Sequence, residues 1–111
     1  MADERIYMTA ILTPTPGKED RLEEVLLKQA EHVRKNEPGT LRFQVQRGTE
    51  RGGTETRFVV WEVYKDEASH KIHFESEALR NLMQTFQEEG LADGPKNVFR
   101  TSAKGGVTRE A

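Results

Sequence analysis

The sequence predicts an α+β fold of the ferredoxin-like, split β-α-β type, in which helices cover one face of an antiparallel sheet. Stretches with the two-residue alternation of strands and stretches with the period of amphipathic helices follow one another in the order β-α-β-β-α-β. Glycine and proline stand at the breaks between these stretches. At 111 residues the chain has the length of a single domain.

The first half of the chain predicts a strand, a helix and a second strand. Residues 6–13 are mostly apolar and rich in β-forming side chains, and the sequence PTPG ends them. Residues 18–36 carry apolar side chains three to five positions apart, opposite a charged face, which is typical of an amphipathic helix. The turn NEPG at 36–39 ends this helix, because proline removes a donor and glycine permits a turn. Residues 40–47 alternate apolar and polar side chains, as in a half-buried strand.

A third strand at 57–65 follows a polar turn at 48–56. It is apolar on both faces, which predicts a central position in the sheet. Alternation divides its side chains between two faces, with Phe58, Val60, Glu62 and Tyr64 on one and Val59, Trp61 and Val63 on the other.

The second half ends with helices and a weak strand. An aspartate and a serine can cap helices at about 66–75 and 76–89. Residues 95–102 predict the last strand. We therefore expect one domain over 1–102 and a mobile C-terminal tail over 103–111, since that tail has little to bury.

Composition excludes several classes of protein. Lysine and arginine are scattered and the formal net charge is −2, so nothing predicts a nucleic-acid partner or an anionic membrane. The absence of cysteine excludes disulfides, thiol chemistry and cysteine-ligated metals. No apolar run approaches the roughly 20 residues of a membrane span, and the expectation is a soluble, cytoplasmic protein. With 34% hydrophobic residues the core is thin, and a second copy packed on the open sheet face would supplement it.

Two residue types could carry chemistry. Glu62 lies in mid-strand among apolar neighbours, so it faces water, pairs with a cation or lies in a pocket with a raised pKa. His73 lies near an apolar helix face, where it is either a structural histidine or a base, whereas His70 is expected to be exposed. The two histidines lack a third ligand of suitable spacing, which argues against a metal site. Trp61 and Tyr64 are either sheet aromatics or the walls of a cavity.

Three segments carry a resemblance to a known family. They are ILTPTPGKEDRLEEVL, NEPGTLRFQVQR and FVVWEVYKDEASHKIHFESEAL. Together they resemble the antibiotic biosynthesis monooxygenase-like group of dimeric α+β barrel proteins, over about residues 5–100. The resemblance implies a homodimer whose two sheets close a barrel, with a pocket in each subunit between sheet and helices. Its characterised members include cofactor-independent oxygenases of phenolic polyketides, heme-degrading enzymes and isomerases of small metabolites.

The resemblance assigns candidate site residues. Glu62 and Tyr64 match the E-x-W positions of the family's third strand, and His73 and Phe74 match its histidine and the residue that follows it. Two departures matter: Tyr64 replaces a tryptophan, and Ala78 stands where many members have a second histidine. Ala10 or a neighbour stands at the first-strand position where an asparagine is expected, and the last helix has no axial histidine. Both features argue against heme degradation.

The leading hypothesis is an oxygenase that uses neither metal nor flavin and acts on a hydroxylated aromatic or polyketide-type molecule. His73 would be the general base, assisted by Glu62, with Tyr64, Trp61 and Phe74 holding the substrate. The alternatives are an isomerase or dehydratase on the same scaffold and a non-catalytic dimeric protein that binds a small molecule. A cavity lined by His73, Tyr64 and Glu62 would favour an enzyme. A solvent-facing Glu62, with His73 bonded to a backbone carbonyl, would favour the non-catalytic protein.

Overall fold

Four strands form one antiparallel sheet. They are β1 (Ile6–Leu12), β2 (Thr40–Thr49), β3 (Thr56–Tyr64) and β4 (Asn97–Thr101), in the spatial order β2-β3-β1-β4. The structure is a computed structural model that describes residues 4–93 and 97–109. β3 pairs with both β1 and β2, which confirms its predicted central position.

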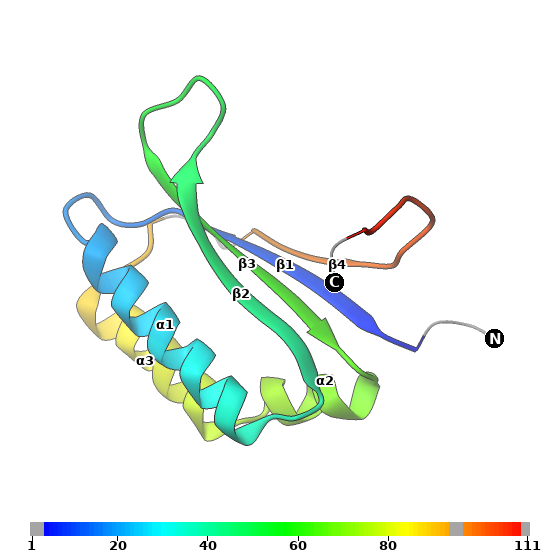
Figure 1. Cartoon of the computed structure of the whole chain (residues 1–111). Coiled ribbons are helices and arrows are strands. Elements are labelled where there is room, and N and C mark those ends of the chain that lie inside the picture. Colours follow the sequence, from blue (N-terminus) through cyan, green and yellow to red (C-terminus); the bar gives the residue numbers. More distant parts are fainter. Residues whose placement is uncertain (1–3, 94–96, 110–111) are drawn as a thin grey trace.

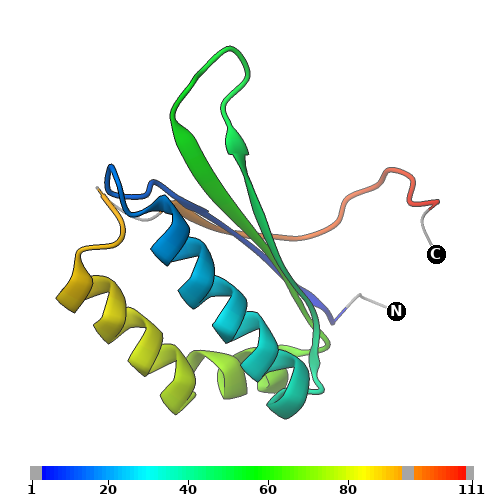
Figure 2. The same cartoon turned by 60° about the vertical axis from the view of Figure 1, so that its left-hand side comes forward.

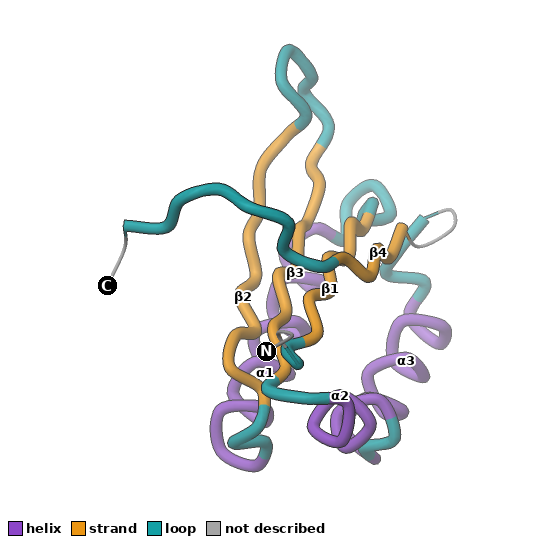
Figure 3. The backbone as a smooth tube through the Cα atoms, turned by 90° about the vertical axis from the view of Figure 1, so that its right-hand side faces the viewer, coloured by secondary structure: helices purple, strands orange, loops and turns teal. Residues whose placement is uncertain are grey.

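Three helices cover one face of this sheet (Figure 1). They are α1 (Glu19–Asn36), α2 (Glu67–Phe74) and α3 (Glu77–Glu89). α1 and α3 lie side by side along the sheet, and the short α2 lies at the end of the sheet where β3 finishes (Figures 1 and 2). The predicted ferredoxin-like α+β fold is confirmed. The single chain is an open sheet rather than a closed barrel, and the described residues place no layer on its second face (Figure 3).

Capping side chains and a glycine determine where α2 begins and where α3 begins and ends. The Asp66 carboxylate accepts a hydrogen bond from the Ser69 amide at 2.8 Å and so caps α2. The Ser76 hydroxyl accepts from the Leu79 amide at 3.1 Å and caps α3 in the same way. Gly90 ends α3 in the left-handed conformation, with φ of 60°, which glycine adopts without a steric cost.

The two faces of β3 have different environments. Phe58, Val60 and Tyr64 point toward the helices and are buried, as predicted from the alternation. Trp61 points to the open face and is 41% exposed. Glu62 shares the helix-covered face with the buried residues and is only partly accessible. A carboxylate therefore lies between the sheet and the helices.

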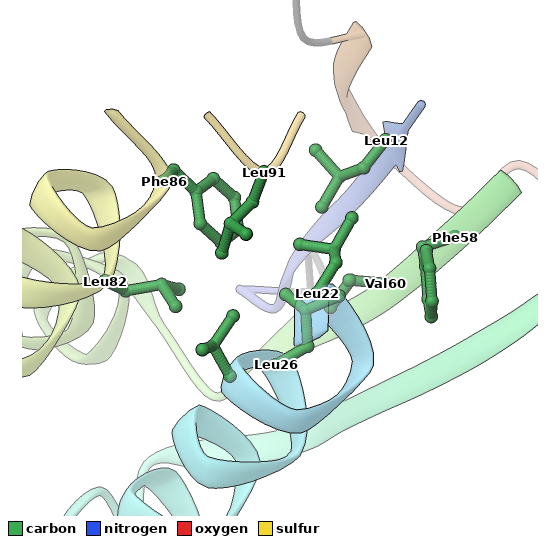
Figure 4. Packing of buried hydrophobic residues seen from close by; sticks show 9 residues of the cluster. Leu12, Leu22, Leu26, Phe58, Val60, Leu82, Phe86 and Leu91 are labelled. Atoms are coloured by element: carbon green, nitrogen blue, oxygen red, sulfur yellow. The ribbon is translucent and has the colours of Figure 1, made fainter. Parts of the chain in front are cut away.

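The core joins the sheet to α1 and α3 (Figure 4). Its side chains come from both layers and from the loop after α3, which closes one end: Leu12, Leu22, Val25, Leu26, Phe58, Val60, Leu82, Phe86 and Leu91. Burial of such side chains stabilises the fold by roughly 1.5–3 kcal/mol each.

Two segments extend beyond the packed layers. The hairpin that joins β2 to β3 projects past the helices, and residues 102–109 run away from them (Figures 1 and 2). β4 is shorter than the predicted 95–102, whose first two positions lie outside the described residues. Mobility of residues 103–111 remains a prediction. None of the helices in the described ranges is long and apolar enough to cross a bilayer.

Candidate functional site

A cavity of about 270 Å³ lies between the sheet and the helices beside α2. Its walls are mostly apolar and come from β1, β2, β3, β4 and all three helices: Met8, Ala10, Leu12, Leu26, Phe43, Val60, Glu62, His70, His73, Phe74, Leu79, Leu82, Met83, Phe86 and Val98. Phe74 is 66% exposed and Val98 is also exposed, which places the mouth between α2 and β4. The polar groups, Glu62, His70 and His73, gather at the end formed by α2 and β3.

His73 is the most deeply placed ionisable group in the cavity wall. It is 5% exposed, and its ring packs against the rings of Phe43 and Tyr64 at centroid distances of 5.6 and 5.3 Å. Its Nε2 lies 3.8 Å from Glu62 Oε1. Its Nδ1 lies 2.7 Å from Glu37 Oε1, on the side away from the cavity. The imidazole is thus held between two carboxylates, and its hydrogen-bond partner is a side chain rather than a backbone carbonyl.

Glu62 is turned inward and is bonded to Tyr64. The Tyr64 hydroxyl donates a hydrogen bond to Glu62 Oε1. Burial raises the pKa of Glu62, an effect opposed in part by the Tyr64 hydrogen bond and by the charge of His73. Burial, with the neighbouring Glu62 carboxylate, also raises the pKa of Tyr64 far above its usual value. Tyr64 is therefore a neutral donor at physiological pH, and Glu62 takes up a proton more readily than an exposed glutamate.

Comparison with known proteins assigns the family. A family model of antibiotic biosynthesis monooxygenases matches residues 5–85. This chain belongs to the antibiotic biosynthesis monooxygenase family. No curated protein matches the sequence.

Several solved structures have the same fold. A candidate antibiotic biosynthesis monooxygenase from Caulobacter crescentus is 24% identical, with a TM-score of 0.79 over 93% of this chain and 92% of that one. A similarly named protein from Nitrosomonas europaea is 18% identical, with a TM-score of 0.79 over 93% of both chains. A Mycobacterium tuberculosis protein is 19% identical, with a TM-score of 0.77 over 94% and 99%. At these identities the similarity shows the fold.

Four of the five predicted site residues of this family member lie together. His73, Glu62 and Phe74 line the cavity, whereas Tyr64 is fully buried behind Glu62 and reaches the site through its hydroxyl. Trp61 is on the opposite face of β3, below the Arg42 guanidinium at 5.7 Å, and so lies apart from the cavity. The reason is the strand's alternation, which sends adjacent side chains to opposite faces.

His70 differs from its prediction. It was expected to be exposed, but it is half-buried, lines the cavity and packs edge-on against Tyr64 at 5.0 Å. Burial lowers its pKa, with a smaller contribution from the positive charge of Arg100. Arg100 is bonded to Glu67 at 2.7 Å and so links β4 to α2 close to the mouth. His70 is thus a neutral ring in the cavity wall at physiological pH.

Glu37 is a site residue that the sequence did not reveal. Its sequence context, NEPG, was interpreted only as the end of a helix, yet it is 5% exposed and bonded to His73. The sequence around Glu37 indicates only a turn, because the partner that gives Glu37 its role, His73, lies 36 positions away. Within residues 4–93 and 97–109, no three His, Asp or Glu side chains are arranged to hold a metal ion.

Proposed function

We propose that this protein is an oxygenase that acts, without metal or flavin, on a small hydroxylated aromatic or polyketide-type molecule, with His73 as its general base. The observation that supports this most directly is a buried imidazole whose Nε2 is at the polar end of an apolar cavity of about 270 Å³. A histidine titrates close to neutral pH when unperturbed, which suits a general base.

The proposed chemistry begins with proton removal. His73 Nε2 takes a proton from an acidic phenol or enol, and the resulting anion passes one electron to molecular oxygen. The two radicals combine to form a carbon–oxygen bond, and the peroxide loses water. The ring carbon that forms this bond is conjugated with the hydroxyl and is a CH2 group in the keto tautomer of the substrate. It gives up both hydrogens and becomes a carbonyl that holds one oxygen atom, while the second oxygen atom leaves with those two hydrogens as water. The apolar walls favour a spread-out organic anion over a small hydrated one, because they exclude water from it.

The surrounding residues have separate roles in this proposal. Glu62, which Tyr64 holds by a hydrogen bond, orients the substrate hydroxyl or balances the charge of protonated His73. Phe74 is at the mouth, where an aromatic ring can stack on a flat substrate. Among the described side chains that line the cavity there is no arginine or lysine, so phosphorylated or carboxylated substrates are a poor fit.

The size of the cavity limits the substrate. An apolar cavity of roughly 150 Å³ accommodates benzene, so about 270 Å³ suits a molecule of two fused rings. A third ring would extend through the mouth beside Phe74. We therefore expect naphthalenediols to be accepted at least as well as anthrones.

The test is oxygen consumption with a panel of hydroquinones, naphthalenediols and anthrones, with product mass measured in parallel. His73→Ala should abolish protein-dependent uptake, and His73→Asn, which keeps a donor toward Glu37, should do the same. General-base catalysis typically contributes about 10²- to 10⁴-fold, so the loss should be at least of that order. Ile72→Ala, an exposed neighbour on α2, is the control and should retain activity. A metal chelator should have no effect.

Uptake that survives in both His73 variants would remove His73 as the base. Uptake abolished by the chelator would contradict metal-free chemistry.

One observation favours a second candidate, an isomerase. The raised pKa of Glu62 places a potential acid 3.8 Å from the His73 base, and such a pair can remove a proton at one atom and return it at another. Exchange of substrate protons with deuterated water, without oxygen uptake, would support isomerisation. Neither oxygen uptake nor exchange, together with tight binding of an aromatic ligand, would support the non-catalytic binding protein.

A further inference from the structure

The turn between α1 and β2 contacts His73 from the side opposite the cavity. Glu37 Oε1 lies 2.7 Å from His73 Nδ1 and also accepts a hydrogen bond from the Thr40 hydroxyl at 3.1 Å. The second oxygen, Oε2, is buried without a hydrogen-bond partner among the described residues and lies 3.6 Å from His32 Nε2. Two imidazoles thus face one buried carboxylate.

The charge on Glu37 determines which His73 nitrogen carries hydrogen. An ionised carboxylate can only accept, so the contact at 2.7 Å requires a hydrogen on His73 Nδ1. The Thr40 hydroxyl supplies a second donor to the same oxygen, and His32 adds a group that becomes cationic on protonation. In the neutral ring Nε2 then has the free lone pair. Nε2 is the nitrogen that faces Glu62 and the cavity.

Packing holds this turn tightly against α2, which carries His73. A Cβ atom on Gly39 would lie 2.1 Å from the Ser69 hydroxyl oxygen, so glycine is required for the approach. The backbone amide of Lys65 donates to the Gly39 carbonyl at 2.8 Å, and the amide of Thr40 donates to the Glu37 carbonyl at 3.0 Å. Glu37 and His73 come from different elements, and Gly39 sets the distance between those elements.

We propose that Glu37 is the positioning residue for His73: it fixes the ring with hydrogen on Nδ1, so that Nε2 is the atom that takes the substrate proton. Its negative charge also stabilises the imidazolium that proton uptake forms. This proposal rests on the proposed function of His73 as base. Glu37 itself lies behind the ring rather than in the cavity wall, and so acts through His73.

The test combines a spectroscopic and a kinetic readout. The chain has three histidines, so ¹⁵N-histidine labelling gives three ring spin systems, which His32→Gln and His70→Gln assign. At a pH where the ring is neutral, the wild-type protein should show His73 with hydrogen on Nδ1. Glu37→Gln should show His73 either as a mixture of the two tautomers or with hydrogen on Nε2, because an amide can donate to Nδ1 as well as accept from it. Glu37→Asp keeps the charge and should retain part of the Nδ1-protonated form. Glu31→Gln, an exposed change on α1, should match wild type.

In oxygen-uptake assays, Glu37→Gln should lower kcat at least about tenfold with KM within about twofold, since it alters the base and not the cavity. The proposal would be overturned if the His73 ring of the wild-type protein carried its hydrogen on Nε2, or if Glu37→Gln left the tautomer unchanged. If Glu37→Gln does not fold, the wild-type spectrum alone still tests the proposal. Absence of oxygen uptake by wild type would count against the proposed function only, because the spectra decide the role of Glu37 independently.

Discussion

Individual residues create a sharp contrast of polarity in the cavity. The walls are largely hydrocarbon, yet Glu37, His73, Glu62 and Tyr64 form a continuous series of close contacts at one end. Placing two carboxylates and an imidazole in a poorly hydrated site is unfavourable for folding unless each has a partner. Such an arrangement is typical of sites where protonation states are adjusted for chemistry.

Glu62→Gln should stabilise the protein at neutral pH relative to wild type. Burial raises the pKa of Glu62 in the folded protein, so folding favours the protonated carboxyl. The stability that this carboxyl contributes is fully present below the unfolded pKa of about 4.5 and is lost as pH rises through the raised pKa of the folded state. Glutamine stays neutral and can still accept the Tyr64 hydrogen bond. Urea unfolding should therefore show a gain in the free energy of unfolding that is larger at pH 8 than at pH 4.

The exposed Glu31 gives the matching control for this change. The hydrogen bond from Arg34 lowers the pKa of Glu31, so Glu31→Gln should give no gain at pH 8. An equal effect of Glu62→Gln at both pH values would show that Glu62 ionises normally in the folded protein.

Sequence reasoning identified residues whose signal is local and missed one whose signal is not. Glu62 was recognisable because a carboxylate interrupts an apolar strand, and His73 because it lies between apolar neighbours. Glu37 acquires its role from a residue 36 positions away, which no local pattern encodes. The burial of His70 was missed for a similar reason: its polar neighbours on α2 suggested solvent, but Tyr64 on β3 covers one side of the ring.

At the scale of the elements, the short helix α2 determines where His73 lies. It has only eight residues, so its position depends on contacts with β2, β3 and the turn at Gly39 rather than on its own helical stability. Asp66 fixes its start and Ser69, which is buried, faces Gly39. A small displacement of this helix would move His73 relative to both of its carboxylate partners.

Gly39→Ala tests this fit. The added methyl group would overlap Ser69, so α2 must shift, and the free energy of unfolding should fall by about 1–3 kcal/mol. Ser69→Gly removes the opposing side chain and should restore part of the loss when combined with Gly39→Ala, although glycine within a helix costs about 1 kcal/mol. Chemical denaturation of the four proteins in the cycle measures the coupling. Strictly additive effects would show that the two residues do not meet.

The whole molecule leaves one sheet face uncovered by its described residues. Trp61 and Phe99 are exposed there, and Arg42 lies over the Trp61 ring. For a chain with a thin core, an exposed apolar sheet face is a candidate site for a partner. We propose that a second copy covers this face, as the family resemblance implies, and that the two sheets together close the barrel that a single chain does not form.

Trp61→Glu should convert the proposed dimer to a monomer. The substitution removes the apolar area of the indole and buries a carboxylate in the interface, a desolvation cost that the neighbouring Arg42 offsets only in part. The variant's own core, on the other side of the sheet, is unchanged. Sedimentation velocity should show a dimer for wild type and a monomer for Trp61→Glu, with similar circular dichroism. Leu27→Glu is the matched control, because Leu27 is 50% exposed on α1, away from the open face, and should leave the dimer intact. A monomeric wild-type protein would contradict the proposal.

At the scale of the whole molecule, the fold was largely predictable from the sequence, because it follows from the order of the elements and from the alternation of apolar and polar side chains. The caps at Asp66 and Ser76 and the breaks at proline and glycine located each helix and strand to within a few residues. The cavity was less predictable. Its walls come from seven elements, and its volume depends on how closely the helices approach the sheet.

The alternation of side chains along β3 also limits where this protein can tolerate insertions and deletions. Glu62 and Trp61 are neighbours in sequence and belong to opposite faces, so losing or gaining one residue within β3 would exchange them. The carboxylate would move to the open face and the indole into the cavity. The hairpin between β2 and β3 carries no such constraint, since it projects beyond the packed layers (Figure 1). Insertions and deletions should therefore accumulate at residues 50–55, and β3 should keep its length.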